Sequence, residues 1–347
     1  MTTTVCGRSN MVLILTILLL LAGIIVLPGL GFSFTDLAQT QDMSDAEQSL
    51  TIVHNTWSSG APMPKSVGGS AAGVLNGQIY VIGGTHGTAI VANNQIYNPS
   101  TNTWTTGTAL PTAIAGASGA VVAGVLYVFG GTGDIQTASN AVWGYNPTTK
   151  KWTAEATMPT ARWSTAAVVE NKIVYVMGGA VDTSHYVAIV ESYNPATNTW
   201  TEEASMLGNK AQPAAGRLGT TLTGFTIVAV DGATQPSVFT GNNEGYDATS
   251  NTWHTLAADP RPRVATCFGS IGQKFYDVGG EPNPNGNATN VNESYTLSTN
   301  TWKTTLAPIP HATMFPFSAV YMGKLYCIGG RATPSGIEMH SVQIYQP

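Results

Sequence analysis

The chain has little charge and little cysteine for its length. Only 10% of its 347 residues are Asp, Glu, Lys or Arg, against about 25% in an average globular protein. The net charge is -5 and the basic residues form no cluster, so nothing in the sequence attracts a phosphate backbone. We therefore do not expect nucleic acid as a partner.

The sequence also lacks the usual marks of metal and nucleophile chemistry. Its six histidines show no ligand spacing such as His-x-x-x-His, and it contains neither a Gly-x-Ser-x-Gly elbow nor a phosphate-binding glycine loop. We expect no metal and no cofactor. The three cysteines give no disulfide framework. A bridge between Cys267 and Cys327 is one alternative, but the sequence favours two separately buried thiols.

One long apolar run is present, from Met11 to Leu27, with Arg8 before it. A run of about 20 residues can span a bilayer, whereas the core of a signal peptide is usually shorter. We predict a hydrophobic helix in residues 1–34, either an anchor through residues 11–30 or a cleaved signal peptide. An acidic polar linker is expected over 35–50. Positive charge before the run places the rest of the chain outside the cytoplasm, membrane-anchored or secreted.

A segment that ends in two glycines recurs along the rest of the chain. Its first copy is Tyr80-Val81-Ile82-Gly83-Gly84, and a degraded copy ends in Asp231-Gly232. The six units lie 47 to 53 residues apart, a period typical of propellers. A tyrosine and then a tryptophan follow in the same order, at Tyr97, Tyr145, Tyr193, Tyr246, Tyr295 and Tyr345, and at Trp104, Trp152, Trp200, Trp253 and Trp302. Four short strands per unit make one blade, so residues 51–347 are predicted to form an all-β, six-bladed propeller.

The ring is expected to close through the N-terminal end of this region. The last unit stops at Tyr345 without a tryptophan strand, whereas Asn55-Thr56-Trp57 precedes the first unit. We predict that this N-terminal strand completes the last blade. Closure of this kind covers sheet edges that would otherwise invite aggregation.

These residues resemble the kelch family, in which a diglycine after an apolar strand and a spaced Tyr and Trp repeat around a propeller. The resemblance covers about 51–347. It implies the fold, but kelch propellers include cytoskeletal and ubiquitin-ligase adaptors, sugar-active enzymes and copper oxidases, so function must be argued from a site. The oxidases need a cysteine crosslinked to a tyrosine, and Cys267 and Cys327 lie in strands expected to pack against neighbours. A galactose-oxidase-like activity is therefore disfavoured.

Two sets of residues are candidates for a site at the ends of the central channel. The first set follows the prolines that open the innermost strands and is predicted either to form a cationic rim for carboxylates or to fix the blade ends: Lys65, Arg162, Arg261, Arg263 and His311. Trp163 beside them is expected either to hold a flat ligand or to fill the core. In the second set, Glu281 and Arg331 share one place in adjacent blades. They are predicted to be either a proton-transfer pair with an anion-holding arginine or a surface ion pair.

A third set points to structure. Glu191, Glu244 and Glu293 each stand two residues before the repeat tyrosine, where Gln95 and Gln343 stand in other blades. An amide cannot act as a base, so this position predicts a structural hydrogen bond.

Two functions remain open at this level. The first is a monomeric interaction module that presents its loop face to a protein or a glycan. The second, implied by the resemblance, is an enzyme similar to the bacterial kelch mutarotases of sialic acid, in which Arg162, Arg263, Arg331 and Glu281 hold and protonate an anionic sugar. A purely structural surface protein is a third alternative.

Overall fold

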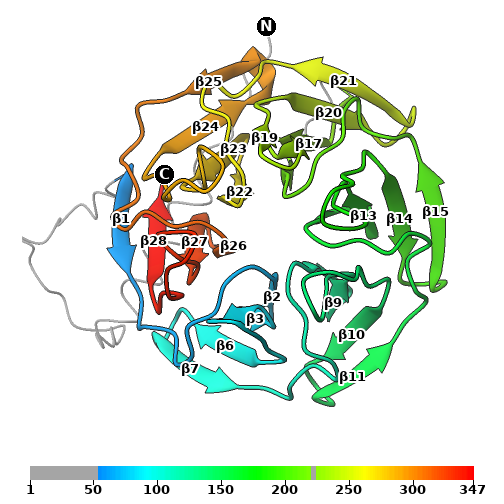
Figure 1. Ribbon diagram of the computed structural model, residues 1–347, viewed down its shortest axis with the longest axis vertical. Helices are drawn as coiled ribbons and strands as arrows, with labels where there is room; N and C mark the ends of the chain where they lie inside the picture. The colour runs from blue at the N-terminus through cyan, green and yellow to red at the C-terminus, as the bar shows by residue number, and fades with distance from the viewer. Residues whose placement is uncertain (1–53, 220–223) are drawn as a thin grey trace, which may run out of the picture. The chain divides into compact units, whose positions relative to one another are not determined.

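The computed structural model describes residues 54–219 and 224–347. They form six four-stranded antiparallel sheets around a central axis, like the blades of a propeller (Figure 1). The predicted six-bladed all-β architecture is confirmed. The expected N-terminal helix and linker lie outside the described residues, and no helix within the described ranges is long and apolar enough to cross a membrane.

Each blade runs from an innermost to an outermost strand. Blades 1 and 2 contain β2 (Ala71–Leu75), β3 (Gln78–Ile82), β6 (Asn94–Asn98), β7 (Thr103–Thr106), β8 (Ser118–Val122), β9 (Val125–Phe129), β10 (Val142–Asn146) and β11 (Lys151–Ala154). Blades 3 and 4 contain β12 (Ala166–Glu170), β13 (Ile173–Met177), β14 (Val190–Asn194), β15 (Thr199–Glu203), β16 (Ala214–Arg217), β17 (Ile227–Val230), β20 (Asn243–Asp247) and β21 (Thr252–Leu256). Blade 5 contains β22 (Cys267–Ile271), β23 (Lys274–Val278), β24 (Asn292–Thr296) and β25 (Thr301–Lys303).

The last blade joins the two ends of the described chain. It contains β26 (Phe317–Tyr321), β27 (Lys324–Ile328), β28 (Val342–Gln346) and β1 (Thr56–Ser59). Strand β1 lies antiparallel to β28, with Trp57 opposite Tyr345. The closure predicted from the missing last tryptophan is therefore confirmed.

The glycine pairs allow neighbouring blades to approach closely. Gly83 and Gly84 have φ angles of +67° and +99°, a region that side chains with a Cβ atom rarely adopt. A Cβ atom on Gly83 would also lie 2.5 Å from the carbonyl oxygen of Ile114 in the connection to the next blade. Each diglycine therefore positions the loop that follows it against the neighbouring blade.

The Asn-Thr-Trp turns hold adjacent blades together by hydrogen bonds. Trp200 Nε1 donates to the carbonyl of Ala156 at 2.9 Å. Asn198 Oδ1 accepts both the Ala156 N–H and the Tyr193 hydroxyl at 2.8 Å. The same asparagine contacts recur at Asn55, Asn102, Asn251 and Asn300. Five of the six blades thus use one asparagine to fix their tyrosine and the preceding blade.

The expectation of two separate thiols is wrong. Cys267 of β22 and Cys327 of β27 form a disulfide between blades 5 and 6, with Cα atoms 5.6 Å apart. Both residues are at most 1% exposed. The sequence shows that each cysteine is in a strand, but their separation depends on how neighbouring blades pack.

Candidate functional site

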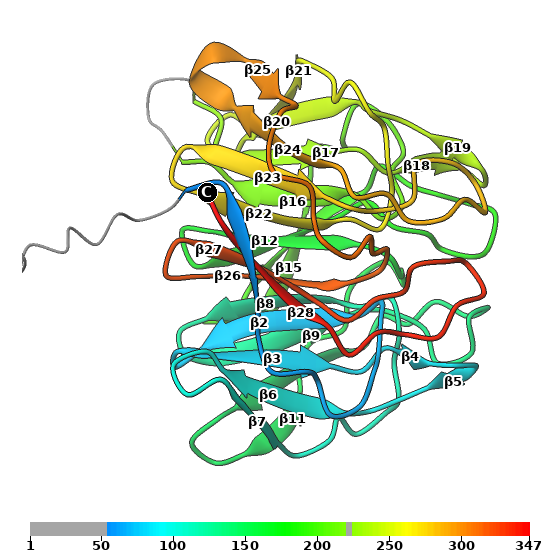
Figure 2. The same ribbon diagram turned by 90° about the vertical axis from the view of Figure 1, so that its left-hand side faces the viewer.

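One end of the propeller carries the loops that follow the glycine pairs, and we call it the loop face. Two hairpins project there, β4 (Thr85–His86) with β5 (Ala89–Ile90) and β18 (Ala233–Gln235) with β19 (Val238–Phe239), as Figure 2 shows. The residue after each glycine pair forms a bridge with the segment that enters the innermost strand of the same blade. Examples are Thr85 with Gly68, and Arg331 with Met314. The loops and the channel mouth are therefore one connected region.

Backbone hydrogen bonds link neighbouring blades at this end. The residue two positions before each innermost strand has a left-handed φ. These residues are Gly69, Gly116, Ser164, Gln212, Ala265 and Phe315. The N–H of Gly116 donates to the carbonyl of Gly69 at 2.7 Å, and the N–H of Ser164 donates to Gly116 at 2.6 Å. The same bond joins Gln212 to Ser164, Phe315 to Ala265, and Gly69 to Phe315. These five bonds cross from blade to blade and so fix the entries to the innermost strands relative to one another.

A pocket of about 400 Å³ is lined by five of these six residues, all except Ala265. Blades 1, 2, 3, 4 and 6 contribute to it, through residues that include Thr85, Thr132, Trp163, Tyr186, Gln212, Phe315, Arg331 and Glu338. A pocket of this size is within the range of small-molecule sites. Of the residues singled out from the sequence, the structure brings together Trp163 and Arg331 here.

Three polar atoms in the pocket wall are buried without a hydrogen-bond partner. They are Trp163 Nε1, Gln212 Oε1 and Arg331 Nε. The Arg331 guanidinium lies 5.0 Å from the centre of the Phe315 ring, which holds it by a cation–π contact. Buried polar groups are normally paired, and an unpaired one in a folded protein needs an explanation. Protein atoms cover all three in this structure, so a ligand in the pocket would meet the half-buried Arg331 side chain and the aromatic rings rather than these atoms.

Glu338, which is 3% exposed, is not among the residues that the sequence marks as candidates. Its Oε1 accepts from the Thr85 hydroxyl at 3.0 Å, and its Oε2 accepts from the Gly87 N–H at 2.8 Å. Glu338 belongs to the loop between β27 and β28, so it ties blade 6 to the first hairpin of blade 1. No motif marks it, because its partners are 253 and 251 residues away along the chain.

The cationic rim predicted from Arg162 and Arg263 is wrong. Both arginines are 0% exposed and lie inside blades 3 and 5. Arg162 Nη2 binds Glu191 at 2.7 Å, and Arg263 Nη1 binds Glu293 at 2.6 Å. Burial lowers the pKa of Arg162, and Glu191 offsets this in part. These guanidinium groups turn inward because a buried carboxylate in the same blade satisfies them.

The other members of the predicted rim do not line the pocket. Lys65 and His311 are exposed, and each has its backbone N–H bonded to a glutamine of its blade, Gln95 and Gln343. Arg261 lies partly exposed and donates through Nε to Glu293 Oε1 at 2.8 Å. The alternative that this position fixes blade ends therefore fits the contacts of Arg162, Arg261 and Arg263.

Glu281 occupies the same place in blade 5 as Arg331 in blade 6, as the alignment of the repeats predicts. Burial raises the pKa of Glu281, while hydrogen bonds from the N–H groups of Asn285 and Gly286 and the charge of Arg331 oppose the rise. Glu281 does not line the pocket. Among the described residues, it also forms no ion pair within 4.0 Å with Arg331. The carboxylate beside the pocket is Glu338 instead.

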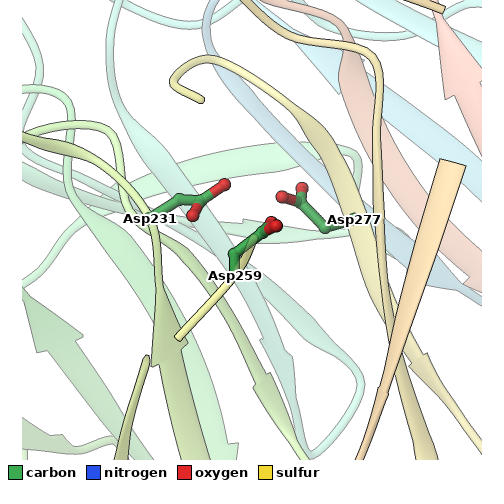
Figure 3. A group of neighbouring side chains, drawn as sticks. All are labelled: Asp231, Asp259 and Asp277. Atoms are coloured by element: carbon green, nitrogen blue, oxygen red, sulfur yellow. The ribbon is translucent and has the colours of Figure 1, made fainter. Parts of the chain in front are cut away.

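A second cluster of functional groups lies between blades 4 and 5. Asp231, Asp259 and Asp277 place carboxylate oxygens within 4.8 Å of one another (Figure 3). Burial raises the pKa of Asp259 to about 8, with Arg263 opposing the rise and Asp277 adding to it. Burial, followed by the charges of Asp277 and Asp259, also raises the pKa of Asp231. Histidine spacing does not reveal this group, because all its members are carboxylates from separate segments.

The fold and the repeated Gly-Gly, Tyr and Trp positions define a six-bladed repeat propeller. Residues 38–232 match the family model described as the KLHDC2/KLHL20/DRC7 Kelch-repeats domain, which is more than half of the chain. The chain therefore belongs to the kelch-repeat family, whose propellers are commonly protein-interaction modules.

Comparison with solved structures agrees with this assignment at the level of the fold. The structure described as "Structure of YjhT" superposes with a TM-score of 0.70 and is 18% identical in sequence. The match covers 82% of this chain and 96% of that chain. No curated protein matches the sequence.

Proposed function

We propose that the protein is a binding module whose loop-face pocket holds the acidic end of a glycan. The observation that carries this proposal is the half-buried Arg331 in the wall of a pocket that also carries aromatic and hydroxyl side chains. Sugar hydroxyl groups can both donate and accept, and a carboxylate is the natural partner of a guanidinium group.

The remaining wall suits a sugar ring. Trp163, Tyr186 and Phe315 supply aromatic surface, and Thr85 and Thr132 supply hydroxyl groups. Such a mixture of apolar surface with a few fixed polar groups is typical of small-ligand sites. Arg331 already lies against Phe315, so little side-chain freedom is lost when a ligand binds it.

We do not propose that the protein converts its ligand. The carboxylate beside the pocket, Glu338, already accepts two hydrogen bonds, and Glu281 lies outside the lining. The mutarotase-like alternative remains a prediction. It is tested by following anomer exchange by NMR in the same ligand samples.

The binding experiment is calorimetry and thermal melting with N-acetylneuraminate and glucuronate. Their methyl esters serve as matched ligands without the charge. Ligand at a hundredfold excess over its Kd should add about 2.7 kcal/mol to the free energy of unfolding. Arg331→Ala should weaken binding of the acids by about 1.5–3 kcal/mol.

Lys65→Ala is the matched control, since Lys65 is an exposed cation that does not line the pocket. Its affinity for the acids should equal that of the wild type. Binding that is equally tight for acids and esters, or unchanged by Arg331→Ala, would exclude recognition of the charge at this pocket. Binding of a peptide but of none of the sugars would identify a protein ligand instead.

The proposal places the protein outside the cytoplasm. The disulfide between Cys267 and Cys327 supports this location, because structural disulfides persist in oxidising compartments and are rare in the cytosol. Cell fractionation with thiol titration of the native protein tests the location. Recovery in the cytosol with both thiols free would refute it.

A further inference from the structure

Three positions near blades 4 and 5 depart from the repeat in the same way, because each carries an aspartate. Asp231 stands where the other blades have the first glycine of the pair: Gly83, Gly130, Gly178, Gly279 and Gly329. Asp259 stands where they have Met63, Leu110, Met158, Met206 and Ile309. Asp277 stands where they have Val81, Val128, Val176, Ala229 and Cys327. A fold that needs only glycine or apolar side chains at these places does not explain three acids.

The fold brings these three departures together. Asp231 follows β17 in blade 4, Asp259 lies in the connection into blade 5, and Asp277 lies within β23. Their exposures are 1%, 3% and 0%. In Figure 3 the three carboxylates point toward one another, and their oxygen atoms lie within 4.8 Å.

Arg263 binds one side of this group only. Its Nη2 lies 3.0 Å from Asp277 Oδ2 and 3.4 Å from Asp259 Oδ2. The backbone N–H of Arg261 donates to Asp259 Oδ1 at 2.8 Å. Both oxygens of Asp231 and the Oδ1 atom of Asp277 are buried without a hydrogen-bond donor. Asp231 therefore presents an unpaired, almost fully buried carboxylate to the other two.

The charges of the group do not balance. Asp231, Asp259, Asp277 and Glu293 provide four carboxylates, whereas Arg261 and Arg263 provide two guanidinium groups. The neighbouring Lys210 is already paired with Glu244 at 3.4 Å. When all four carboxylates are ionised, two negative charges are left without a cation, and burial of unpaired charge is strongly unfavourable. Either protons or a bound cation must therefore supply two positive charges.

We propose that Asp231, Asp259 and Asp277 bind one divalent cation of the oxygen-preferring class, Ca²⁺, between blades 4 and 5. The donors are carboxylates alone, and Ca²⁺ accepts mono- or bidentate carboxylates in flexible geometry. Its charge of +2 matches the two positive charges that the ionised group lacks. Arg263 orients Asp277 and Asp259 from the opposite side, as outer partners of metal ligands commonly do. The cation ties blade 4, where the glycine pair is degraded, to blade 5.

The test measures bound metal and stability on the full-length protein. Because the site is buried, the protein is unfolded in denaturant with EDTA and refolded with either 1 mM CaCl₂ or EDTA. We expect about one Ca²⁺ per chain by elemental analysis after desalting, and a higher melting temperature for the protein refolded in CaCl₂. A sample refolded in NaCl of the same ionic strength is the control. No retained metal, or equal melting in CaCl₂, EDTA and NaCl, would overturn the proposal and leave protons as the counter-charges.

Variants test whether the effect of Ca²⁺ on the melting temperature comes from this site. Asp231→Asn should abolish the Ca²⁺-dependent rise in melting temperature, and it should fold because Asn tolerates the left-handed φ of +56° at this position. Asp231→Gly restores the diglycine of the other blades and serves as a second removal of the ligand. Asp182→Asn is the matched control, an aspartate with a 45% exposed side chain in a loop of blade 3. If the Ca²⁺ effect persists in both Asp231 variants, the cation is not held here.

Discussion

Arg162 Nη2 lies 2.7 Å from Glu191 Oε2 in the interior of blade 3, and the arginine is 0% exposed. The partners of this pair change together from blade to blade. In blades 3, 4 and 5 the position equivalent to Arg162 carries a cation, Arg162, Lys210 or Arg263, and the position equivalent to Glu191 is then a glutamate. In blades 1 and 6 the position equivalent to Arg162 is the uncharged Val67 or Thr313. The position equivalent to Glu191 is then Gln95 or Gln343, whose amide group forms hydrogen bonds with the backbone instead. Blade 2 has Ile114 and Trp143 at these places. Charge is therefore matched at this pair of positions in each blade.

The first prediction concerns this pairing. Glu191→Gln should lower the free energy of unfolding by about 3–5 kcal/mol, because it leaves the buried Arg162 cation without a counter-charge. Arg162→Met with Glu191→Gln removes both charges and should cost less than the single change. Urea unfolding of the three proteins measures the difference. A double variant no more stable than Glu191→Gln would show that charge neutrality is not what couples the two positions.

The second prediction is a stabilising change in blade 2. Lys150 has a φ of +55° and occupies the place of the asparagine that accepts the tyrosine hydroxyl and the N–H of the preceding blade elsewhere. Lys150→Asn supplies the missing oxygen in a backbone conformation that asparagine favours. We expect a gain of about 0.5–1.5 kcal/mol in the free energy of unfolding. Lys150→Ala, which adds no acceptor, should give no gain, and equal effects of the two changes would refute the explanation.

The third prediction concerns the disulfide that joins Cys267 to Cys327. The bridge closes a segment with a sequence separation of 60, and a disulfide of this kind stabilises a protein by about 2–4 kcal/mol. Guanidinium unfolding with and without dithiothreitol measures the effect, with the reduced protein expected to unfold at lower denaturant. Cys267→Ala with Cys327→Ala should be insensitive to the reductant. Coincident curves for the wild type in both conditions would contradict this expectation.

The fourth prediction is a pH effect on the blade 2 loop. Hydrogen bonds from the N–H groups of Thr137 and Gln136 lower the pKa of Asp134 to about 2. Because the folded value is below the unfolded value, which is about 3.9, the stability that Asp134 gives to this loop is present above about pH 4. It is lost as the pH falls toward 2. NMR titration of the Asp134 carboxyl carbon checks the midpoint, and a midpoint near 4 would show that the loop bonds do not form in solution.

The glycine pairs, the asparagine turns and the missing last tryptophan predicted the fold and its closure from the sequence. These signals are local: a left-handed φ at Gly83, or the turn at Asn198, acts within a few residues and recurs in each blade. The Glu191 position was also correctly interpreted as structural, because Gln95 and Gln343 replace it in other blades. The sequence also marks Trp163, beside Arg162, and Arg331, after the last glycine pair, as site candidates, and both line the pocket.

The sequence by itself determined the number of blades, the order of strands and the way the ring closes. Only the tertiary structure decided which polar side chains face inward and which ones meet. Arg162 and Trp163 are neighbours in the chain, yet one is buried in a blade and the other lines the pocket. Glu338 reaches Thr85 across the closure, and Asp231 reaches Asp277 across a blade boundary. Such contacts depend on packing between blades, because residues far apart in the chain meet only when the ring is formed.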